Sequence, residues 1–111
     1  MQRYLFKKCL IVYSQKMLES SIQKKVIKYL LDEGCKVINL KVASKSGNAD
    51  LVICYKGMYV EFEMKQPGKE ATKMQLIKGR ETTEAGGHWF CIHSVREAIK
   101  AIELLTYSNE S

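Results

Sequence analysis

Two β-rich runs separated by only two residues constrain the fold of this chain most strongly. Residues 50–55 read DLVICY, residues 58–65 read MYVEFEMK, and a Lys-Gly pair lies between them. Runs of β-branched and aromatic residues with a two-residue connection predict a β-hairpin whose glycine takes a positive φ. The connection also fixes the pairing, so that Asp50 is expected directly opposite Glu63.

The predicted pairing gathers charged side chains over one spot of the hairpin. Opposite side chains on antiparallel strands lie roughly 5 Å apart at Cβ, so the Asp50 and Glu63 carboxylates would repel each other unless a cation lay between them. Because side chains alternate along a strand, Lys65 shares the face of Glu63, and the opposite face is apolar. Glu61 lies on the charged face but pairs with Val52, so we interpret it as a flank of the site or a surface charge.

The set Asp50, Glu63 and Lys65 suits phosphodiester hydrolysis. Mg²⁺ prefers one or two carboxylates together with waters and substrate phosphate. Asp50 and Glu63 could supply these carboxylates, with the Met64 backbone carbonyl directed at the same place. Lys65 could orient or deprotonate the attacking water, or stabilise the charge on the phosphate. The alternative is that these are solvated charges on an exposed strand face, and the cross-strand register favours the site.

Charge and cysteine content narrow the class of protein. A chain of 111 residues indicates one domain. Its net charge of +6 favours a polyanionic partner such as nucleic acid, or an anionic membrane surface, although many small basic proteins bind nothing charged. The four cysteines show no C-x-x-C spacing, which argues against a zinc knuckle. Cys35, Cys54 and Cys91 are expected to be buried thiols of a cytoplasmic protein. No apolar run approaches the roughly 20 residues that span a bilayer, so no membrane partner is expected.

The remaining pattern predicts three helices and two further strands. An apolar stripe favours a helix over residues 18–33, and a strand covered on both faces follows at 36–42. Capping boxes begin helices at residues 72–85 and 94–105, and residues 88–93 read as a strand between them. The order αβββαβα predicts an α/β protein with a mixed four-stranded sheet flanked by helices.

These elements also divide the chain. Residues 1–16 are expected to form an extension or arm, and residues 17–107 a single domain. Residues 108–111 are expected to be a frayed tail.

Four short stretches carry a resemblance to a known family. They are Glu19 on the first helix, Ser46-Gly47-Asn48-Ala49-Asp50-Leu51 before a strand, Glu63-Met64-Lys65-Gln66-Pro67-Gly68 at the end of the next strand, and Thr72-Lys73-Met74-Gln75 at the start of a helix. Together they resemble the VRR-NUC domain of the PD-(D/E)xK nuclease superfamily, over residues 17–105. The family often has proline before the first acid, where this chain has Ala49, and the Val-Arg-Arg string of the family name is absent.

This resemblance implies a restriction-endonuclease-like core and a stand-alone nuclease that uses Mg²⁺, with Mn²⁺ as a substitute. Asp50 and Glu63 would be metal ligands, Lys65 the catalytic lysine, Glu19 an outer or water-mediated ligand, and Gln75 a residue that orients the lysine or the water. Small phage and bacterial members of the family are homodimers that cut branched DNA such as four-way (Holliday) junctions. The implied partners are therefore branched DNA and a second copy of the chain.

Two of these residues have competing structural roles. Gln75 also completes the capping box that Thr72 begins. Glu19 lies near the start of a helix, where the macrodipole favours an acid.

The residues around the predicted site are less specific. Four lysines in or beside the surrounding loops could contact phosphates, or form a solvated basic rim: Lys41, Lys45, Lys69 and Lys73. The spacing of His88 and His93 suits no helical metal pair, so a structural or surface role is expected, and Trp89 is expected in the core. The rival interpretations are a basic DNA-binding module without catalysis and a small partner-binding protein.

Overall fold

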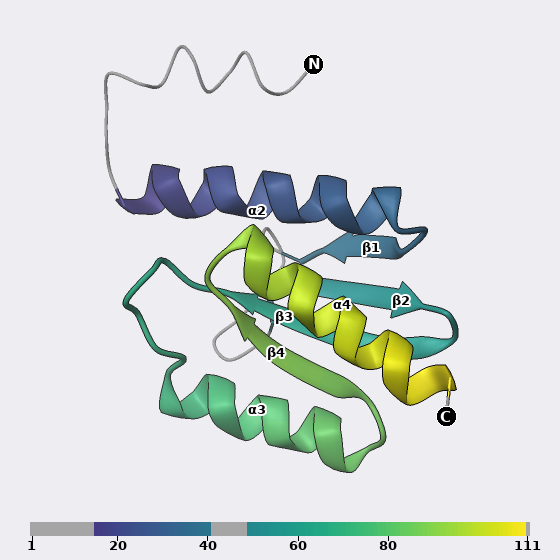
Figure 1. Cartoon of the computed structure of the whole chain (residues 1–111). Coiled ribbons are helices and arrows are strands. Elements are labelled where there is room, and N and C mark those ends of the chain that lie inside the picture. The colour runs from purple at the N-terminus through teal and green to yellow at the C-terminus, as the bar shows by residue number, and fades with distance from the viewer. Residues whose placement is uncertain (1–14, 41–48, 111) are drawn as a thin grey trace.

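The order of elements predicted from the sequence is confirmed. The computed structural model describes residues 15–40 and 49–110, with the side chains of residues 21–40 and 49–108. Its elements are α2 (Gln15–Asp32), β1 (Lys36–Asn39), β2 (Leu51–Tyr55), β3 (Met58–Met64), α3 (Lys73–Glu84), β4 (His88–Ile92) and α4 (Val95–Glu110) (Figure 1).

One mixed sheet in the order β1-β2-β3-β4 forms the centre of the fold. The first three strands form an antiparallel meander, and β4 pairs parallel to β3 after the chain crosses over through α3. The predicted fold class, an α/β protein with an αβββαβα core, is therefore confirmed.

The β2–β3 hairpin has the register that the sequence predicts. Its pairs run from Tyr55 and Met58 to Leu51 and Phe62. Both turn residues have positive φ, 50° at Lys56 and 82° at Gly57, which is the geometry that matches the twist of the flanking strands.

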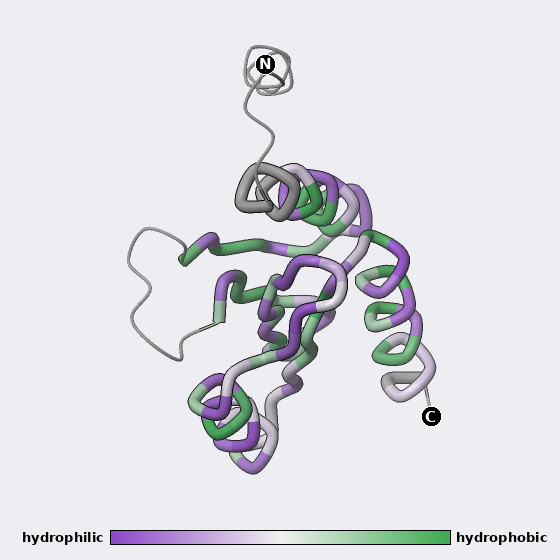
Figure 2. Tube along the Cα trace, turned by 90° about the vertical axis from the view of Figure 1, so that its left-hand side faces the viewer, coloured by the Kyte–Doolittle hydropathy of each residue, from purple (hydrophilic) through white to green (hydrophobic). Residues whose placement is uncertain are grey.

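The hydrophobic core lies between the sheet and the helices α2 and α4. Val26 and Leu30 of α2 and Ile102 of α4 pack with Phe62 of β3, and all are at most 2% exposed. Among the described residues, α3 contributes no side chain to this core. Figure 2 shows α2 and α4 on one side of the strands and α3 apart from them. The alternation in β3 therefore directs Phe62 to the core and Glu63 towards α3.

A glycine brings α3 close to β4. A Cβ atom at Gly79 would lie 2.5 Å from the ring of Trp89, which is closer than carbon atoms pack. Trp89 is half-buried between β4 and α3, on the opposite face of the sheet from the α2–α4 core. The sequence analysis expected Trp89 in the core, but the structure does not place it in the hydrophobic core.

Two predictions about burial are wrong. β1 is an edge strand, with Ile38 48% exposed, so it is not covered on both faces. Cys54 is exposed because it alternates with the buried Ile53 and Tyr55, whereas Cys35 is buried and Cys91 half-buried. The strand was predicted to reach residue 42, but β1 ends at Asn39 and the described Leu40 lies beyond it. Residues 41 and 42 fall outside the described residues.

The ends of the outer helices differ from the predicted divisions. α2 begins at Gln15, two residues inside the segment expected to be an arm. α4 continues to Glu110, so residues 108–110, expected to be frayed, are helical. None of the helices in the described ranges is long and apolar enough to cross a membrane.

Candidate active site

Asp50 lies where β2 leaves the pairing with β3. The ladder ends at Leu51 and Phe62, one residue short of the predicted Asp50–Glu63 pair. The Asp50 N–H instead donates to the Phe62 carbonyl at 3.2 Å, out of step with the ladder. Its side chain then turns towards β3, where Oδ2 accepts the Met64 N–H at 2.9 Å. The Asp50 carboxylate is therefore fixed against the backbone of the residue that follows Glu63.

Glu63 is the buried acid of the site. It lies at the end of β3, is 3% exposed and faces α3. Its Oε2 accepts a hydrogen bond from Gln75 Nε2 at 2.9 Å. A carboxylate removed from water is retained at low cost only where donors or cations surround it, so this position is poised to hold a charged partner.

The Gln75 side chain both caps the start of α3 and donates a hydrogen bond to the site. Its Oε1 accepts the Thr72 N–H at 2.8 Å, and its own N–H donates to Thr72 Oγ1 at 3.2 Å, which confirms the predicted capping box. The amide nitrogen at the other end of the same side chain is the group that donates to Glu63. The structural role is confirmed, and the predicted role in the reaction stays a prediction.

Lys65 follows β3 directly and lies on the same side as Glu63. Its N–H donates to the Ile92 carbonyl at 2.9 Å, which extends the pairing with β4. Its ammonium group makes no hydrogen bond or ion pair with another described residue, and the side chain is half-buried. A cation placed in this way is available to a ligand.

Cys91 is a neighbour of the site that the sequence analysis did not place there. It pairs with Glu63 in the parallel register of β3 and β4. Burial raises the pKa of the Cys91 thiol, the charge of Glu63 raises it further, and that of Lys65 lowers it. The sequence offered no signal for this contact, because no short motif gives the register of β4 against β3.

For several predicted site residues, the described part of the structure shows no contact with Asp50 or Glu63. Glu19 lies in α2, but its side chain is outside the described residues, as are Lys41 and Lys45 entirely. Lys69, on the turn after β3, and Lys73, the first residue of α3, are exposed. These two stand on the segments that adjoin the acids, and their contact with DNA stays a prediction.

The donors at the site fit a hard divalent cation. The Asp50 and Glu63 carboxylates and the Met64 carbonyl offer only oxygen atoms, the ligands that Mg²⁺ prefers. Among the described side chains, those of residues 21–40 and 49–108, no group of three or more His, Cys, Asp or Glu residues could hold a metal ion. Because Mg²⁺ takes one or two carboxylates and keeps several waters, the two acids suit an open site that water and substrate complete.

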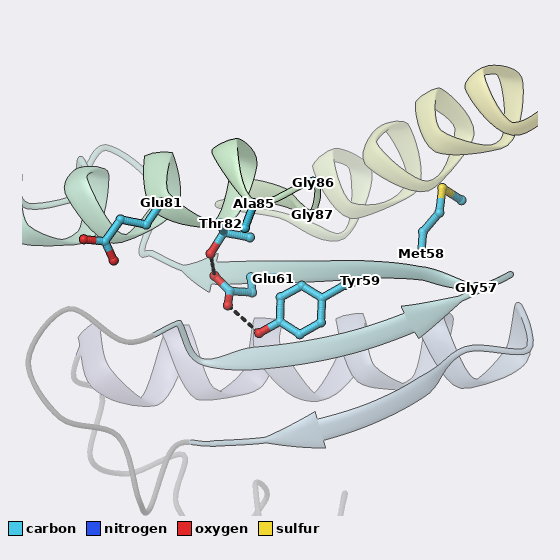
Figure 3. Close-up of a pocket in the computed structure, with 9 residues that line it drawn as sticks. All are labelled: Gly57, Met58, Tyr59, Glu61, Glu81, Thr82, Ala85, Gly86 and Gly87. Atoms are coloured by element: carbon cyan, nitrogen blue, oxygen red, sulfur yellow. Dashed lines mark hydrogen bonds between the residues drawn. The ribbon is translucent and has the colours of Figure 1, made fainter.

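A separate pocket lies at the other end of α3 (Figure 3). It has a volume of about 600 Å³ and is lined by Gly57, Met58, Tyr59, Glu61, Glu81, Thr82, Ala85, Gly86 and Gly87. Both carboxylate oxygens of Glu61 accept hydrogen bonds from hydroxyl groups. The Tyr59 hydroxyl donates to Oε2 at 2.6 Å and the Thr82 hydroxyl donates to Oε1 at 2.8 Å. The hydrogen bond to Glu61, together with burial, raises the pKa of Tyr59 to about 12. Neither Asp50 nor Glu63 lines this pocket, so Glu61 belongs to a different part of the surface.

Comparison with solved structures identifies the fold. A structure described as a VRR_NUC domain matches with a TM-score of 0.67 and 24% sequence identity, over 77% of this chain and 94% of that chain. No family model matches the sequence, and no curated protein matches it. The chain therefore has the fold of a VRR-NUC domain, in agreement with the restriction-endonuclease-like core expected from the sequence.

Proposed function

We propose that this protein is a metal-dependent DNA endonuclease of the VRR-NUC type, which hydrolyses phosphodiester bonds. The observation that carries the proposal is the arrangement of Asp50, Glu63 and Lys65. The Asp50 carboxylate is bound to the backbone beside Glu63, and Lys65 lies one pleat further along the same strand face. The shared fold with a VRR_NUC domain supports this interpretation.

In this proposal Asp50 and Glu63 hold Mg²⁺, or Mn²⁺ in its place, with the Met64 carbonyl and, through water, Glu19. When bound, the cation would neutralise phosphate charge and lower the pKa of water. The protein supplies the positioning: the Met64 N–H fixes Asp50, and Gln75 fixes Glu63. Lys65 orients or deprotonates the attacking water, or stabilises the charge that develops on the phosphate.

We propose branched DNA, including four-way junctions, as the substrate. The net charge of +6 and the exposed side chains of Lys69 and Lys73 support phosphate binding. Lys41 and Lys45 are proposed to join them. The sequence pattern offers no base-reading element, so recognition of DNA structure is expected. A location in the cytoplasm stays a prediction, and the free thiols of Cys35, Cys54 and Cys91 are consistent with it.

We further propose that the chain forms a homodimer, which would present two sites to a symmetric junction. Three apolar side chains of α3 are between 42% and 52% exposed, and a second copy could cover them: Met74, Leu76 and Ile77. Sedimentation velocity should give twice the mass of the 12.7 kDa chain. A monomer at high protein concentration would remove the dimer from the proposal.

A cleavage assay tests the enzyme and its residues together. Labelled four-way junction, flap and linear duplex are incubated with and without Mg²⁺ or Mn²⁺, and wild type is compared with Asp50→Asn and Lys65→Ala. Cutting of branched DNA should require the metal and should be lost in both variants, while circular dichroism shows that they remain folded. The amide introduced by Asp50→Asn keeps an oxygen acceptor for the Met64 N–H, so the fold of this variant should be preserved. Continued cutting by either variant contradicts the assignment.

The alternative is a basic DNA-binding module without catalysis, which the net charge alone would support. It predicts binding that weakens steeply with salt, no dependence on Mg²⁺ and no cutting under any metal. A partner-binding protein would show no affinity for DNA at all.

A further inference from the structure

The turn after β3 is attached to the rest of the protein at two points, and adjacent residues at the end of β4 supply both. The Ile92 carbonyl accepts the Lys65 N–H at 2.9 Å. The next residue, His93, places ring Nε2 2.7 Å from the Lys69 carbonyl. Between these points the turn is closed by the Lys69 N–H, which donates to the Gln66 carbonyl at 3.1 Å. In the described part of the chain, the His93 contact is the one hydrogen bond that joins residues 66–71 to another element.

The second ring nitrogen of His93 is also held. Its Nδ1 lies 2.9 Å from Glu97 Oε1, and the same oxygen accepts the His93 backbone N–H at 2.7 Å. Glu97 is in the first turn of α4, where its own N–H donates to Ser94 Oγ at 3.1 Å. The imidazole is thus fixed between the turn on one side and the start of α4 on the other.

Both ring nitrogens face acceptors. A backbone carbonyl cannot donate, and a carboxylate cannot donate while it is ionised. A neutral imidazole carries only one N–H, so it can satisfy one of the two contacts, whereas the imidazolium ion satisfies both. The geometry therefore selects the charged form of His93.

The surrounding charges favour the same form. The hydrogen bond to Glu97 raises the pKa of His93, burial lowers it, and the Lys69 carbonyl and the charges of Glu97 and Glu70 raise it, with a net upward shift. The pKa of Glu97 is lowered: burial opposes this shift, but the hydrogen bonds from His93 outweigh burial. On β4 itself, Cys91 Sγ lies 3.9 Å from Nε2. The imidazolium therefore faces acidic groups from both α4 and the turn.

We propose that His93 is a positioning residue, whose imidazolium ties the turn at Lys69 to the first turn of α4 and thereby holds Lys65 and Lys69 beside the two acids. When His93 loses a proton, the remaining N–H stays at Nδ1, where it faces the charged Glu97 carboxylate. The contact of Nε2 with the Lys69 carbonyl is then lost and the turn is released. The consequence for catalysis rests on the proposed nuclease function. The hydrogen bonds from His93 to Lys69 and Glu97, which are called the His93 tie below, are independent of that function.

NMR tests the tie without any assay of activity. The His93 ring should titrate above its ordinary pKa of 6.5, and Glu97→Gln should move the titration to lower pH. The ¹⁵N order parameters of Gly68 and Lys69 should fall as the pH rises through this titration. In His93→Gln they should be low already at pH 6 and should no longer respond to pH. His88→Gln, at the other end of β4, is the matched control and should behave as wild type.

Two results would overturn the proposal: a His93 ring that titrates at or below 6.5, or order parameters at Gly68 and Lys69 that are the same in His93→Gln and wild type. A cleavage assay adds the second readout. His93→Gln should reduce kcat/KM by roughly ten- to a hundredfold at pH 6 through misplaced groups, and less at high pH, where wild type has also lost the tie. If wild type cuts no DNA, the nuclease proposal fails while the NMR result still decides the tie. If wild type cuts and His93→Gln cuts equally well at pH 6, the positioning role is wrong.

Discussion

Gln75 and Glu63 are joined by a hydrogen bond of 2.9 Å between the amide nitrogen and the carboxylate. The other end of the same amide accepts the Thr72 N–H and so begins α3. A planar amide with both ends engaged has little freedom to rotate, so the start of the helix and the buried acid of β3 are held in a fixed relation. The position of Glu63 in the site therefore depends on the cap of the following helix.

Replacing Gln75 should affect stability and activity together. Gln75→Ala removes half of the cap, worth about 1 kcal/mol, and a donor to a buried carboxylate, worth about 1–3 kcal/mol. We expect cleavage to fall by roughly ten- to a hundredfold, as when the partner of a metal ligand is removed. Thr72→Ala is the matched control, because it removes the other half of the cap without touching Glu63. Urea unfolding should show a loss of about 1 kcal/mol for Thr72→Ala, with cleavage little changed. Equal loss of cleavage in both variants would show that Gln75 acts only as a cap.

The close approach of α3 to β4 should make Gly79 intolerant of a side chain. Alanine usually gains about 1 kcal/mol over glycine inside a helix, but here its Cβ would lie 2.5 Å from the Trp89 ring. Displacing an aromatic ring in a packed layer costs about 1–3 kcal/mol, so Gly79→Ala should destabilise the protein in urea unfolding. The smaller ring of Trp89→Phe should reduce this cost in the double variant. A stabilised Gly79→Ala protein would mean that α3 can move away from the sheet freely.

Local sequence rules were sufficient to predict the register of the hairpin but not where its strand pairing ends. The Lys-Gly turn fixed five residue pairs, and through them the alternation that separates Phe62 from Glu63. The rules for a regular ladder could not predict that Asp50 leaves it and binds the Met64 N–H instead. The exposure of Cys54 was missed for a related reason, since a continuous apolar run does not reveal which of its side chains point to the covered face of the sheet.

Contacts between distant segments were the least predictable part of the site. His93 is 24 residues from Lys69 along the chain, and only the parallel pairing of β3 with β4 brings them together. The same pairing places Cys91 beside Glu63. Predicting either contact required the relative register of two strands joined by a helix, which no short motif encodes.

A divalent cation should stabilise the folded protein through the two acids. Ligand at a hundred times its dissociation constant adds about 2.7 kcal/mol, which for a domain of this size raises the midpoint of thermal unfolding by roughly 10 °C. Mg²⁺ or Mn²⁺ should therefore raise Tm of the wild type, and EDTA should reverse the rise. Asp50→Asn should lose the response while keeping its fold. NaCl at matched ionic strength is the control for screening, and an equal rise in Asp50→Asn would place the cation elsewhere.

The stability that the Glu97–His93 pair contributes should decrease both at high pH and at low pH. The raised pKa of His93 means that its contribution is complete below the ordinary value of 6.5 and is lost as the pH rises through the folded value. The lowered pKa of Glu97 means that its contribution is present above the ordinary value of 4.5 and is lost as the pH falls through the folded value. The free energy of unfolding of wild type minus that of Glu97→Gln should therefore be largest between pH 4.5 and 6.5.

Urea unfolding of the two proteins from pH 4 to pH 9 measures this difference. Glu103→Gln, at an exposed position of the same helix, is the control for the loss of one negative charge and should give a flat difference over this range. Because Glu97 is 46% exposed and His93 26% exposed, solvent screens the pair, and added salt should reduce the maximum. A difference that falls only at low pH and stays constant above pH 6.5 would mean that Glu97 acts as a cap for the His93 backbone N–H alone, and that the ring carries no charge in the folded protein.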